Sequence, residues 1–305
     1  MRRSTDYLRL SLHITRPHFL LGGFLLFGLG ATIATYLGKP IDWSLFILGQ
    51  LLITSTQLMA QAMYMFFNST RDQEITFRSL FSGNRKALDP EHLPYTAALI
   101  STIVALTISA TLVALLLAVK NVSLVTWAFI LMGFITAFFY STPPVRLITS
   151  GIGEIIATIV LASFVPIISF TLQTGELHRL LLMSTIPLAA LLFAAFIAFE
   201  FRDYASDLKR DRQTLMVRLG WETAMKLHNL ALLFAIISFL TAYVIGLPDR
   251  VALGALISFP LAIAQIWQLN RIKAGLPPRW RTFTLSALAL FAMTAYLELM
   301  GYIFS

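Results

Sequence analysis

Nine long apolar stretches follow one another along this chain and leave it few ways to fold. A helix needs about 20 apolar residues to cross a bilayer, and these stretches fill most of the 305 residues. A soluble protein has no core large enough to bury so many. We therefore predict an all-α membrane protein, a bundle of about nine transmembrane helices, at approximately 18–37, 43–67, 95–119, 122–140, 152–172, 180–201, 224–245, 251–269 and 282–303.

The overall composition narrows the classes of function. Hydrophobic residues make up 57% of the chain and charged residues only 12%, and there is no cysteine, which excludes disulfides and thiolate chemistry. The net charge is +8, but the basic residues do not alternate with aromatic ones as they do in nucleic-acid grooves. We expect a lipid bilayer as the surroundings and no nucleic-acid partner.

The positive charges are distributed unevenly between the two sides of the predicted membrane. If the N-terminus is cytoplasmic, the segments on that side hold nearly all of the 23 Lys and Arg residues. The positive-inside rule then predicts a multi-pass protein of the cell's inner or plasma membrane with its N-terminus inside and its C-terminus outside. The exceptions are Lys39, Lys120, Arg179 and Arg250.

Two connections on the predicted cytoplasmic side are long and charged, whereas the outer connections are short. They cover about 68–94 and 202–223, after the second and the sixth span. Because both follow a span in the same direction, we expect them to meet and to form a cap over one site on the cytoplasmic side. We treat 1–305 as a single domain.

The second of these connections begins with closely spaced acids. If the sixth helix continues, Glu200, Asp203 and Asp207 lie at i, i+3 and i+7 and therefore share one face. Carboxylates this close repel one another unless a cation neutralises them, which favours a metal site. The alternative is a solvated helix end whose acids pair with neighbouring basic residues such as Arg202 and Lys209.

The first connection carries fewer acids and more cations. Asn68 and Asp72 lie one turn apart, which suits either a metal site or a capped helix end. Arg85 and Lys86 follow the turn Phe81-Ser82-Gly83-Asn84, where cations and backbone N–H groups can hold an oxyanion. A positive-inside charge cluster explains the two cations equally well.

Between these connections, Phe139-Tyr140-Ser141-Thr142-Pro143-Pro144 ends the fourth span in a rigid turn. Taken alone, Tyr140 is typical of an aromatic residue at the membrane interface. Taken alone, Glu154 is typical of an acid at a helix N-terminus. Three prolines inside spans are expected to bend their helices: Pro166, Pro187 and Pro260.

Several of these strings together resemble the UbiA-type intramembrane prenyltransferases. They are Phe-Tyr-Ser-Thr-Pro-Pro-x-Arg-Leu followed by Gly-x-Gly-Glu, the acid-rich connection ending at Gly220, Phe-Ser-Gly before Leu88, and Thr-Arg-Pro-His-Phe near the N-terminus. The resemblance covers essentially the whole chain. It implies a transmembrane prenyltransferase-like domain in which two aspartate-rich motifs hold Mg²⁺ and the diphosphate of an isoprenoid donor.

The resemblance assigns the second motif to Asp203 and Asp207, with Glu200 beside them as a further metal ligand. The first motif reads Asn-Asp-x-x-Asp-x-x-x-Asp in the family. Here it retains Asp72 as a catalytic and metal-binding acid, whereas the other positions carry Tyr64, Met65 and Asn68.

If the protein is such an enzyme, further residues are expected around the substrate, including Arg85 and Lys86, which replace a glycine-serine stretch of the family and add positive charge near the diphosphate. The residues expected to bind it are Asn68, Arg85, Lys86, Arg146 and Glu154. Tyr140 is expected to take part in catalysis by steadying an allylic cation.

Two hypotheses remain at this stage. In the first, the protein is a Mg²⁺-dependent enzyme that transfers a prenyl group from an isoprenoid diphosphate to an aromatic or other lipophilic acceptor, as in quinone or lipid biosynthesis. In the second, motivated by the altered first motif, it is an inactive lipid- or quinone-binding subunit of a larger membrane complex. We favour the enzyme, because the second motif, Glu154 and the two-proline turn are retained together.

Overall fold

The computed structural model describes residues 17–69, 93–119, 122–209 and 213–305, and all regular elements in these ranges are helical. A 3₁₀ turn covers Leu147–Thr149 and a π-helical turn covers Val160–Phe164. The α-helices are α2 (Pro17–Tyr36), α3 (Trp43–Ser69), α4 (Leu93–Val119), α5 (Leu124–Ser141), α6 (Gly153–Ile159), α7 (Val165–Thr174), α8 (Arg179–Lys209), α9 (Leu215–Leu219), α10 (Trp221–Ile245), α11 (Asp249–Ile257), α12 (Phe259–Lys273) and α13 (Trp280–Ile303).

Eight helical segments of the described chain are long and apolar enough to cross a membrane, if α6 through α7 and α11 through α12 are each counted as one segment. The apolar part of α2, Leu20–Tyr36, is a ninth and slightly shorter segment. The predicted all-α membrane architecture with about nine spans is thereby confirmed.

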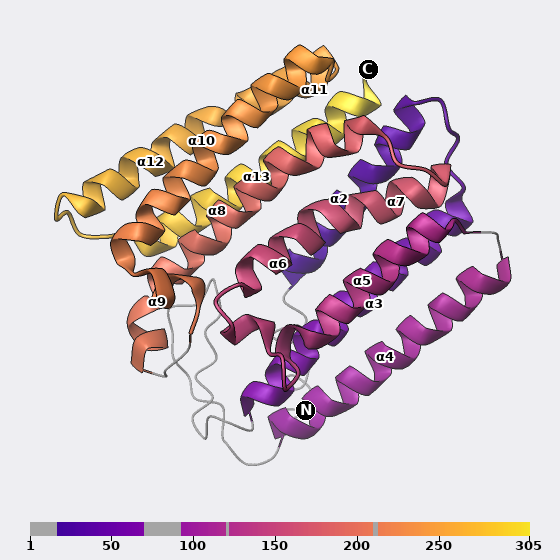
Figure 1. The fold of residues 1–305 in the computed structure, drawn as a ribbon, viewed down its shortest axis with the longest axis horizontal. Coiled ribbons are helices and arrows are strands. Elements are labelled where there is room, and N and C mark those ends of the chain that lie inside the picture. Colours follow the sequence, from indigo (N-terminus) through magenta and orange to yellow (C-terminus); the bar gives the residue numbers. More distant parts are fainter. Residues whose placement is uncertain (1–16, 70–92, 120–121, 210–212) are drawn as a thin grey trace, which may run out of the picture.

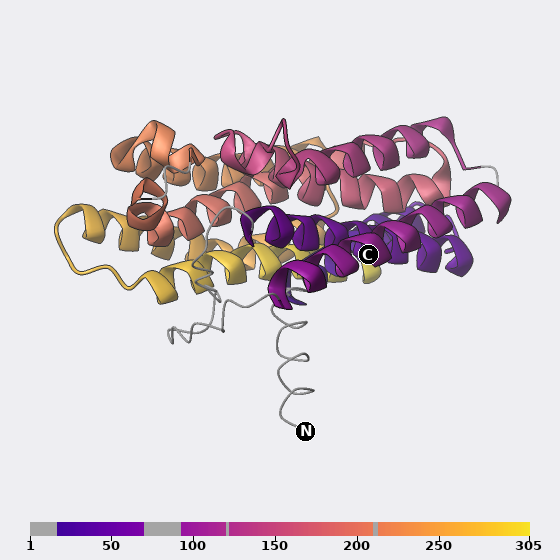
Figure 2. The ribbon, with the colours of Figure 1, turned by 90° about the horizontal axis from the view of Figure 1, so that it is seen from below.

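Helix α8 lies at the centre of the bundle. It packs against α10 and α13 on one side and against α6 and α7 on the other (Figure 1). In its most apolar stretch 67% of the residues are buried, compared with 22% in α4, which lies at the edge. Figure 2 shows the helices stacked in layers, with α5 and α6 on one face and α3, α4 and α13 on the other. Glu200, Asp203 and Asp207 lie in the last turns of α8, at the end of the bundle where α9 also lies. We call this end of the bundle the acidic end.

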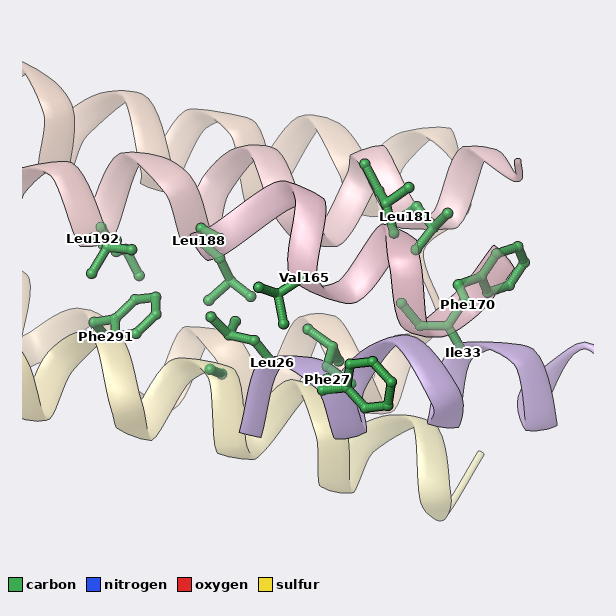
Figure 3. Close-up of a cluster of buried hydrophobic side chains, with 14 of the residues drawn as sticks. Leu26, Phe27, Ile33, Val165, Phe170, Leu181, Leu188, Leu192 and Phe291 are labelled. Atoms are coloured by element: carbon green, nitrogen blue, oxygen red, sulfur yellow. The ribbon is translucent and has the colours of Figure 1, made fainter. Parts of the chain in front are cut away.

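The main core forms where α2, α7, α8 and α13 meet. In Figure 3, Leu26 of α2 lies near Val165 of α7 and Leu188 of α8. None of these three side chains is more than 3% exposed. Because lipid tails are as apolar as such side chains, close packing rather than removal from water holds the helices together.

The closest approach of α2 to α7 depends on Gly30. A Cβ atom at this position would overlap the carbonyl oxygen of Pro166 and lie 2.8 Å from the Ser169 Cβ. The backbone of α7 therefore occupies the space that a side chain at position 30 would need. Small residues at such crossings are the usual device for bringing membrane helices together.

We expect Gly30→Ala to destabilise the protein by about 1–3 kcal/mol, because the added methyl group pushes α2 away from α7. The measurement is SDS-induced unfolding in mixed micelles. Gly22→Ala is the matched control, since nothing lies within 4 Å of the new Cβ, and it should be neutral or gain up to about 1 kcal/mol in helix propensity. Equal effects of the two changes would contradict the close crossing.

The prolines within the spans have different effects on their helices. Pro166 has no N–H to bond to the carbonyl of Ala162, and just before it the chain forms the π-helical turn, in which the Val165 N–H bonds to the Val160 carbonyl. Pro260 lies in the first turn of α12, just after the break that separates it from α11. Helix α8 runs past Pro187 without interruption. Pro166 and Pro260 thus each lie where a span is interrupted, whereas Pro187 does not.

Candidate functional site

A cavity of about 530 Å³ lies within the bundle, a volume typical of small-molecule sites, which span roughly 300–1,000 Å³. Its walls come from α3, α4, α5, the run from α6 through α7, Ile148 of the 3₁₀ turn and Phe196 of α8. Most lining side chains are aliphatic or aromatic, and small residues such as Ala60, Gly133 and Ala137 leave the space open. Three residues of the π-helical turn also line it. Such walls suit a hydrocarbon ligand.

The polar side chains in the cavity come mainly from α3 and α5. Gln57, Gln61 and Tyr64 lie at i, i+4 and i+7 and so share one face of α3, while Thr136 and Tyr140 come from α5. Tyr64 and Tyr140 stand in the last turns of their helices, at the acidic end. The sequence reasoning singled out both tyrosines but missed the two glutamines. Two amides one turn apart inside an apolar span were the signal for them.

The acids of the second motif lie beyond this cavity along α8, at the acidic end. Helix α8 extends to Lys209, so Glu200, Asp203 and Asp207 belong to one helix, as the spacing required. Asp203 begins about 10 Å beyond Phe196 along the helix axis. Asp207 is 8% exposed, whereas Asp203 is partly exposed.

Glu200 is buried and binds the second connection. Its Oε2 accepts a hydrogen bond of 2.8 Å from the backbone N–H of Met216, in the first turn of α9. Glu154, at the start of α6, places its carboxyl group within hydrogen-bonding reach of Glu200, and Asp207 lies within electrostatic range. Oε1 of Glu200 and Oε2 of Glu154 are buried without a hydrogen-bond partner in the described chain. Carboxyl groups in such contact repel each other unless a proton or a cation lies between them.

A second contact holds α9 over the site. Gly151 has a φ of +74°, and the side chain of Arg218 passes directly over it, in the place that a Cβ atom would occupy. Two contacts, the Glu200 bond to Met216 and the Arg218 side chain on Gly151, thus join the second connection to α8 and to the turn before α6. Sequence reasoning found neither, because these partners lie far apart in the chain.

Carboxylates at the acidic end do not make a complete metal site by themselves. Within the described ranges, no three His, Cys, Asp or Glu side chains come close enough to hold one ion. Asp72, Arg85 and Lys86 lie outside the described residues, and for Asn68 the structure describes only the backbone of the last turn of α3. A metal ion at this end therefore needs ligands in addition to Glu200 and the aspartates of α8.

Two of the altered positions in the first motif, Tyr64 and Met65, have side chains that pack within the bundle. Tyr64 lines the cavity. Met65 and Ala97 of α4 both pack against the buried Ala62, so Met65 stands beside the contact between α3 and α4. Restoring an acid at position 65 would thus place a charge at an apolar contact.

Arg146 links the turn after α5 to the end of α3. Its Nη2 donates a hydrogen bond of 3.3 Å to the Phe67 carbonyl, and the guanidinium lies 5.9 Å from the centre of the Phe67 ring. Its backbone is left-handed, with φ 43° and ψ 62°, a conformation that costs a non-glycine residue about 1–2 kcal/mol. Arg146, which we expected to bind the substrate, therefore also positions the end of α3, the helix that leads into the first connection.

We expect Arg146→Ala to lower kcat/KM for prenyl transfer about tenfold, since the last turn of α3 loses its charged hydrogen bond. Arg146→Gly removes the same side chain but relieves the left-handed backbone, so it should be the more stable of the two variants while being equally impaired. Thermal unfolding together with steady-state kinetics separates these effects. Full activity in Arg146→Gly would show that the guanidinium has no positioning role.

Comparison with known proteins agrees with this geometry. The model of the UbiA prenyltransferase family matches residues 24–288. The chain belongs to the UbiA prenyltransferase family. A relative from Bacillus subtilis (strain 168), 1,4-dihydroxy-2-naphthoate octaprenyltransferase, is 26% identical over an alignment of 229 residues that covers 73% of this chain and 69% of that protein. Together they identify this UbiA-family protein as a prenyltransferase, and the resemblance seen in the sequence is confirmed.

Solved structures show the same fold. Digeranylgeranylglyceryl phosphate synthase superposes with a TM-score of 0.63 at 12% identity, over 98% of both chains. A UbiA homologue from Archaeoglobus fulgidus bound to GPP and Mg²⁺ gives a TM-score of 0.61 at 16% identity, over 95% of this chain and 99% of that one. The Archaeoglobus protein thus carries a prenyl diphosphate and a divalent metal on a bundle of the same architecture.

Proposed function

We propose that this UbiA-family protein transfers a prenyl group from an isoprenoid diphosphate to a lipophilic aromatic acceptor, with the diphosphate held on Mg²⁺ beside Asp203 and Asp207. One observation carries the proposal: the apolar cavity is bounded at the acidic end by Tyr64 and Tyr140, on the side toward which α8 continues to its aspartates. An isoprenoid diphosphate has an apolar chain and a charged head, so it needs an apolar cavity that leads to charged side chains.

The oxygen atoms at the acidic end fit a hard cation. Mg²⁺ prefers carboxylate, phosphate and water oxygens and seldom takes all its ligands from protein. Asp203 and Asp207 offer carboxylates, and the partnerless Oε1 of Glu200 and Oε2 of Glu154 are buried beside them. Diphosphate oxygens, water and Asp72 would supply the remaining ligands. When bound, the metal neutralises the charge that builds up on the departing diphosphate.

The transfer itself breaks the bond between C1 of the donor and the diphosphate oxygen, and the electron pair leaves with diphosphate. A ring carbon of the acceptor forms the new bond to C1 and then loses its proton. Tyr64 and Tyr140 present aromatic rings at the end of the cavity where C1 would lie, and such rings attract positive charge. The apolar walls exclude water, which would otherwise capture the allylic cation.

Two further parts of the proposal concern the acceptor and the sidedness. The relative that acts on a dihydroxynaphthoate supports an aromatic acceptor, and the cavity has room for a ring beside the donor. The distribution of Lys and Arg supports a cytoplasmic position for the acidic end and for both connections, with Arg85 and Lys86 near the diphosphate.

The test uses the purified protein in proteoliposomes with Mg²⁺, geranyl or octaprenyl diphosphate, and 1,4-dihydroxy-2-naphthoate or 4-hydroxybenzoate. We expect release of diphosphate and a prenylated acceptor, detected by mass spectrometry. EDTA should abolish both, and added Mg²⁺ should restore them. Failure to bind any prenyl diphosphate at any Mg²⁺ concentration, combined with stoichiometric copurification with other membrane subunits, would support the inactive-subunit hypothesis instead.

A further inference from the structure

Four exposed cations lie where α12 ends and α13 begins. Arg271 and Lys273 belong to the last turn of α12, Arg279 directly precedes α13, and Arg281 lies in its first turn. The chain has no Asp or Glu from 251 to 297, so no acid within this stretch balances the four charges. The transfer reaction proposed above uses none of them. We call these four residues the basic cluster.

The basic cluster lies at the acidic end, where two spans leave the membrane. It joins Asp249–Lys273 to Trp280–Ile303, two segments that are each long and apolar enough to cross a bilayer. The ring of Trp280 stacks on Phe201 of α8 with 6.1 Å between the ring centres, and it lies 5.5 Å from the ring of Trp221 at the start of α10. The four cations therefore lie at the level of the lipid headgroups.

An apolar stripe on the outside of α12 leads to this cluster. Ile263, Trp267 and Arg271 lie at i, i+4 and i+8, so they share one face of the helix. Ile263 is 62% exposed and Trp267 is 57% exposed, so no described helix covers this face. We call Ile263 and Trp267 the apolar stripe.

The cation at the end of the apolar stripe is held in place by the aromatic ring below it. The guanidinium carbon of Arg271 lies 4.7 Å from the centre of the Trp267 ring, which is the geometry of a cation–π contact. Stacking uses the flat face of a guanidinium and leaves the N–H groups on its edge able to donate to a phosphate. Apolar surface that ends in a fixed cation complements a molecule with an apolar tail and an anionic head.

We infer that the basic cluster and the apolar stripe together bind an anionic phospholipid. Its phosphate accepts hydrogen bonds from the cations, and its acyl chains lie along the apolar stripe. Each Lys or Arg near an anionic membrane surface strengthens the attraction roughly fivefold. A free phosphate ion has no use for an apolar stripe. The isoprenoid donor is assigned to the cavity, to which no residue of α12 contributes in the described chain.

A lipid bound here would support the acidic end through aromatic contacts. Trp280 follows Arg279 in the chain, and its ring stacks on Phe201, the neighbour of Glu200 in α8. The ring of Phe201 also lies 5.0 Å from that of Trp221, so one aromatic group joins α8, α10 and α13. A ligand that binds only the folded protein raises its stability. We therefore expect anionic phospholipid to raise the unfolding temperature.

Native mass spectrometry of the purified full-length protein tests the binding. The protein is delipidated in dodecyl maltoside and titrated with phosphatidylglycerol or with phosphatidylcholine of the same chain length. We expect phosphatidylglycerol to bind at least about tenfold more tightly. Arg271→Gln combined with Lys273→Gln should reduce this preference to about twofold or less. Lys39→Gln combined with Arg250→Gln removes the same charge from exposed positions at the opposite end of the bundle and should leave the preference intact.

The apolar stripe is tested separately from the charges. Trp267→Ala removes the ring that holds Arg271 and should weaken the binding of phosphatidylglycerol about threefold or more, whereas Trp267→Phe keeps a ring under the guanidinium and should retain most of the affinity. Trp43→Ala is the control, because this tryptophan is 64% exposed at the start of α3, at the opposite end. It should not change the affinity.

Thermal unfolding provides a second measurement. Phosphatidylglycerol should raise the Tm of the wild type and of the variant changed at Lys39 and Arg250, but not the Tm of the variant changed at Arg271 and Lys273. Equal binding of both phospholipids by the wild type, or an equal loss in the two double variants, would overturn the inference. Displacement of phosphatidylglycerol by inorganic phosphate or by geranyl diphosphate at equal concentration would overturn the assignment to a phospholipid.

These measurements are independent of the proposed function, since none of them uses prenyl transfer. A protein that prefers phosphatidylglycerol at the basic cluster but transfers no prenyl group would support the lipid site and contradict the proposed function. An active enzyme without this preference would contradict the lipid site alone.

Discussion

Asp203→Asn and Asp207→Asn are each expected to lower Mg²⁺-dependent prenyl transfer by about 100-fold or more, the largest effects that we predict. Each change removes a negative charge from the end of α8 that continues from the cavity. Metal stabilisation of the leaving diphosphate contributes several kcal/mol, and each 1.36 kcal/mol corresponds to a tenfold change in rate. The measurement is kcat/KM as a function of Mg²⁺ concentration, with donor binding determined separately.

The controls for this prediction come from the chain itself. Asp249→Asn changes an exposed acid at the start of α11, away from the acidic end, and should have no effect on Mg²⁺ dependence. Asp211→Asn, which lies outside the described residues, should have a smaller effect than the changes in α8. If the variants at 203, 207 and 211 all behave alike, the shared helix face is not the metal site.

The second large effect is expected at Glu200, where two roles can be separated. Glu200→Ala leaves the buried Met216 N–H without its acceptor, which costs about 1–3 kcal/mol. Helix α9 should then detach from the site, and kcat/KM should fall roughly tenfold to a hundredfold. Limited proteolysis of the connection from 210 to 214 should accelerate in parallel.

Glu200→Gln decides between the two roles. Its amide oxygen still accepts the bond from Met216, so α9 stays docked and protease resistance is retained. If Glu200 only anchors α9, Glu200→Gln keeps most of the activity. If Glu200 is also a metal ligand, Glu200→Gln keeps its protease resistance but needs more Mg²⁺ for half-maximal activity. Equal proteolysis of the Ala and Gln variants would contradict the anchoring role.

The first motif remains the part of the site that the family pattern describes least well. Met65 stands where the family has an acid, and it packs on Ala62 beside the contact between α3 and α4. Tyr64 stands where the family has an amide, and it lines the cavity. We therefore expect charge at the diphosphate to come from Arg85 and Lys86, together with the metal held by α8.

Much of the architecture could be predicted from the sequence alone. A backbone in lipid must satisfy its own hydrogen bonds, so long apolar stretches such as 95–119 and 282–303 had to become helices. The acids at 200, 203 and 207 could be assigned to one face because helical spacing is local. The two-proline turn and the acid-rich connection identified the family for the same reason, since they are contiguous strings.

Only the tertiary structure decided which distant residues meet. The partners Glu200 and Glu154, Glu200 and Met216, and Arg146 and Phe67 depend on how far each helix is rotated and shifted along its neighbours. Sequence reveals such rotation through a contrast between apolar and polar faces. In these spans most of every face is apolar, because one side meets lipid and the other meets protein, so that contrast is weak. Close packing at positions such as Gly30 sets the rotation instead, and with it the shape of the cavity.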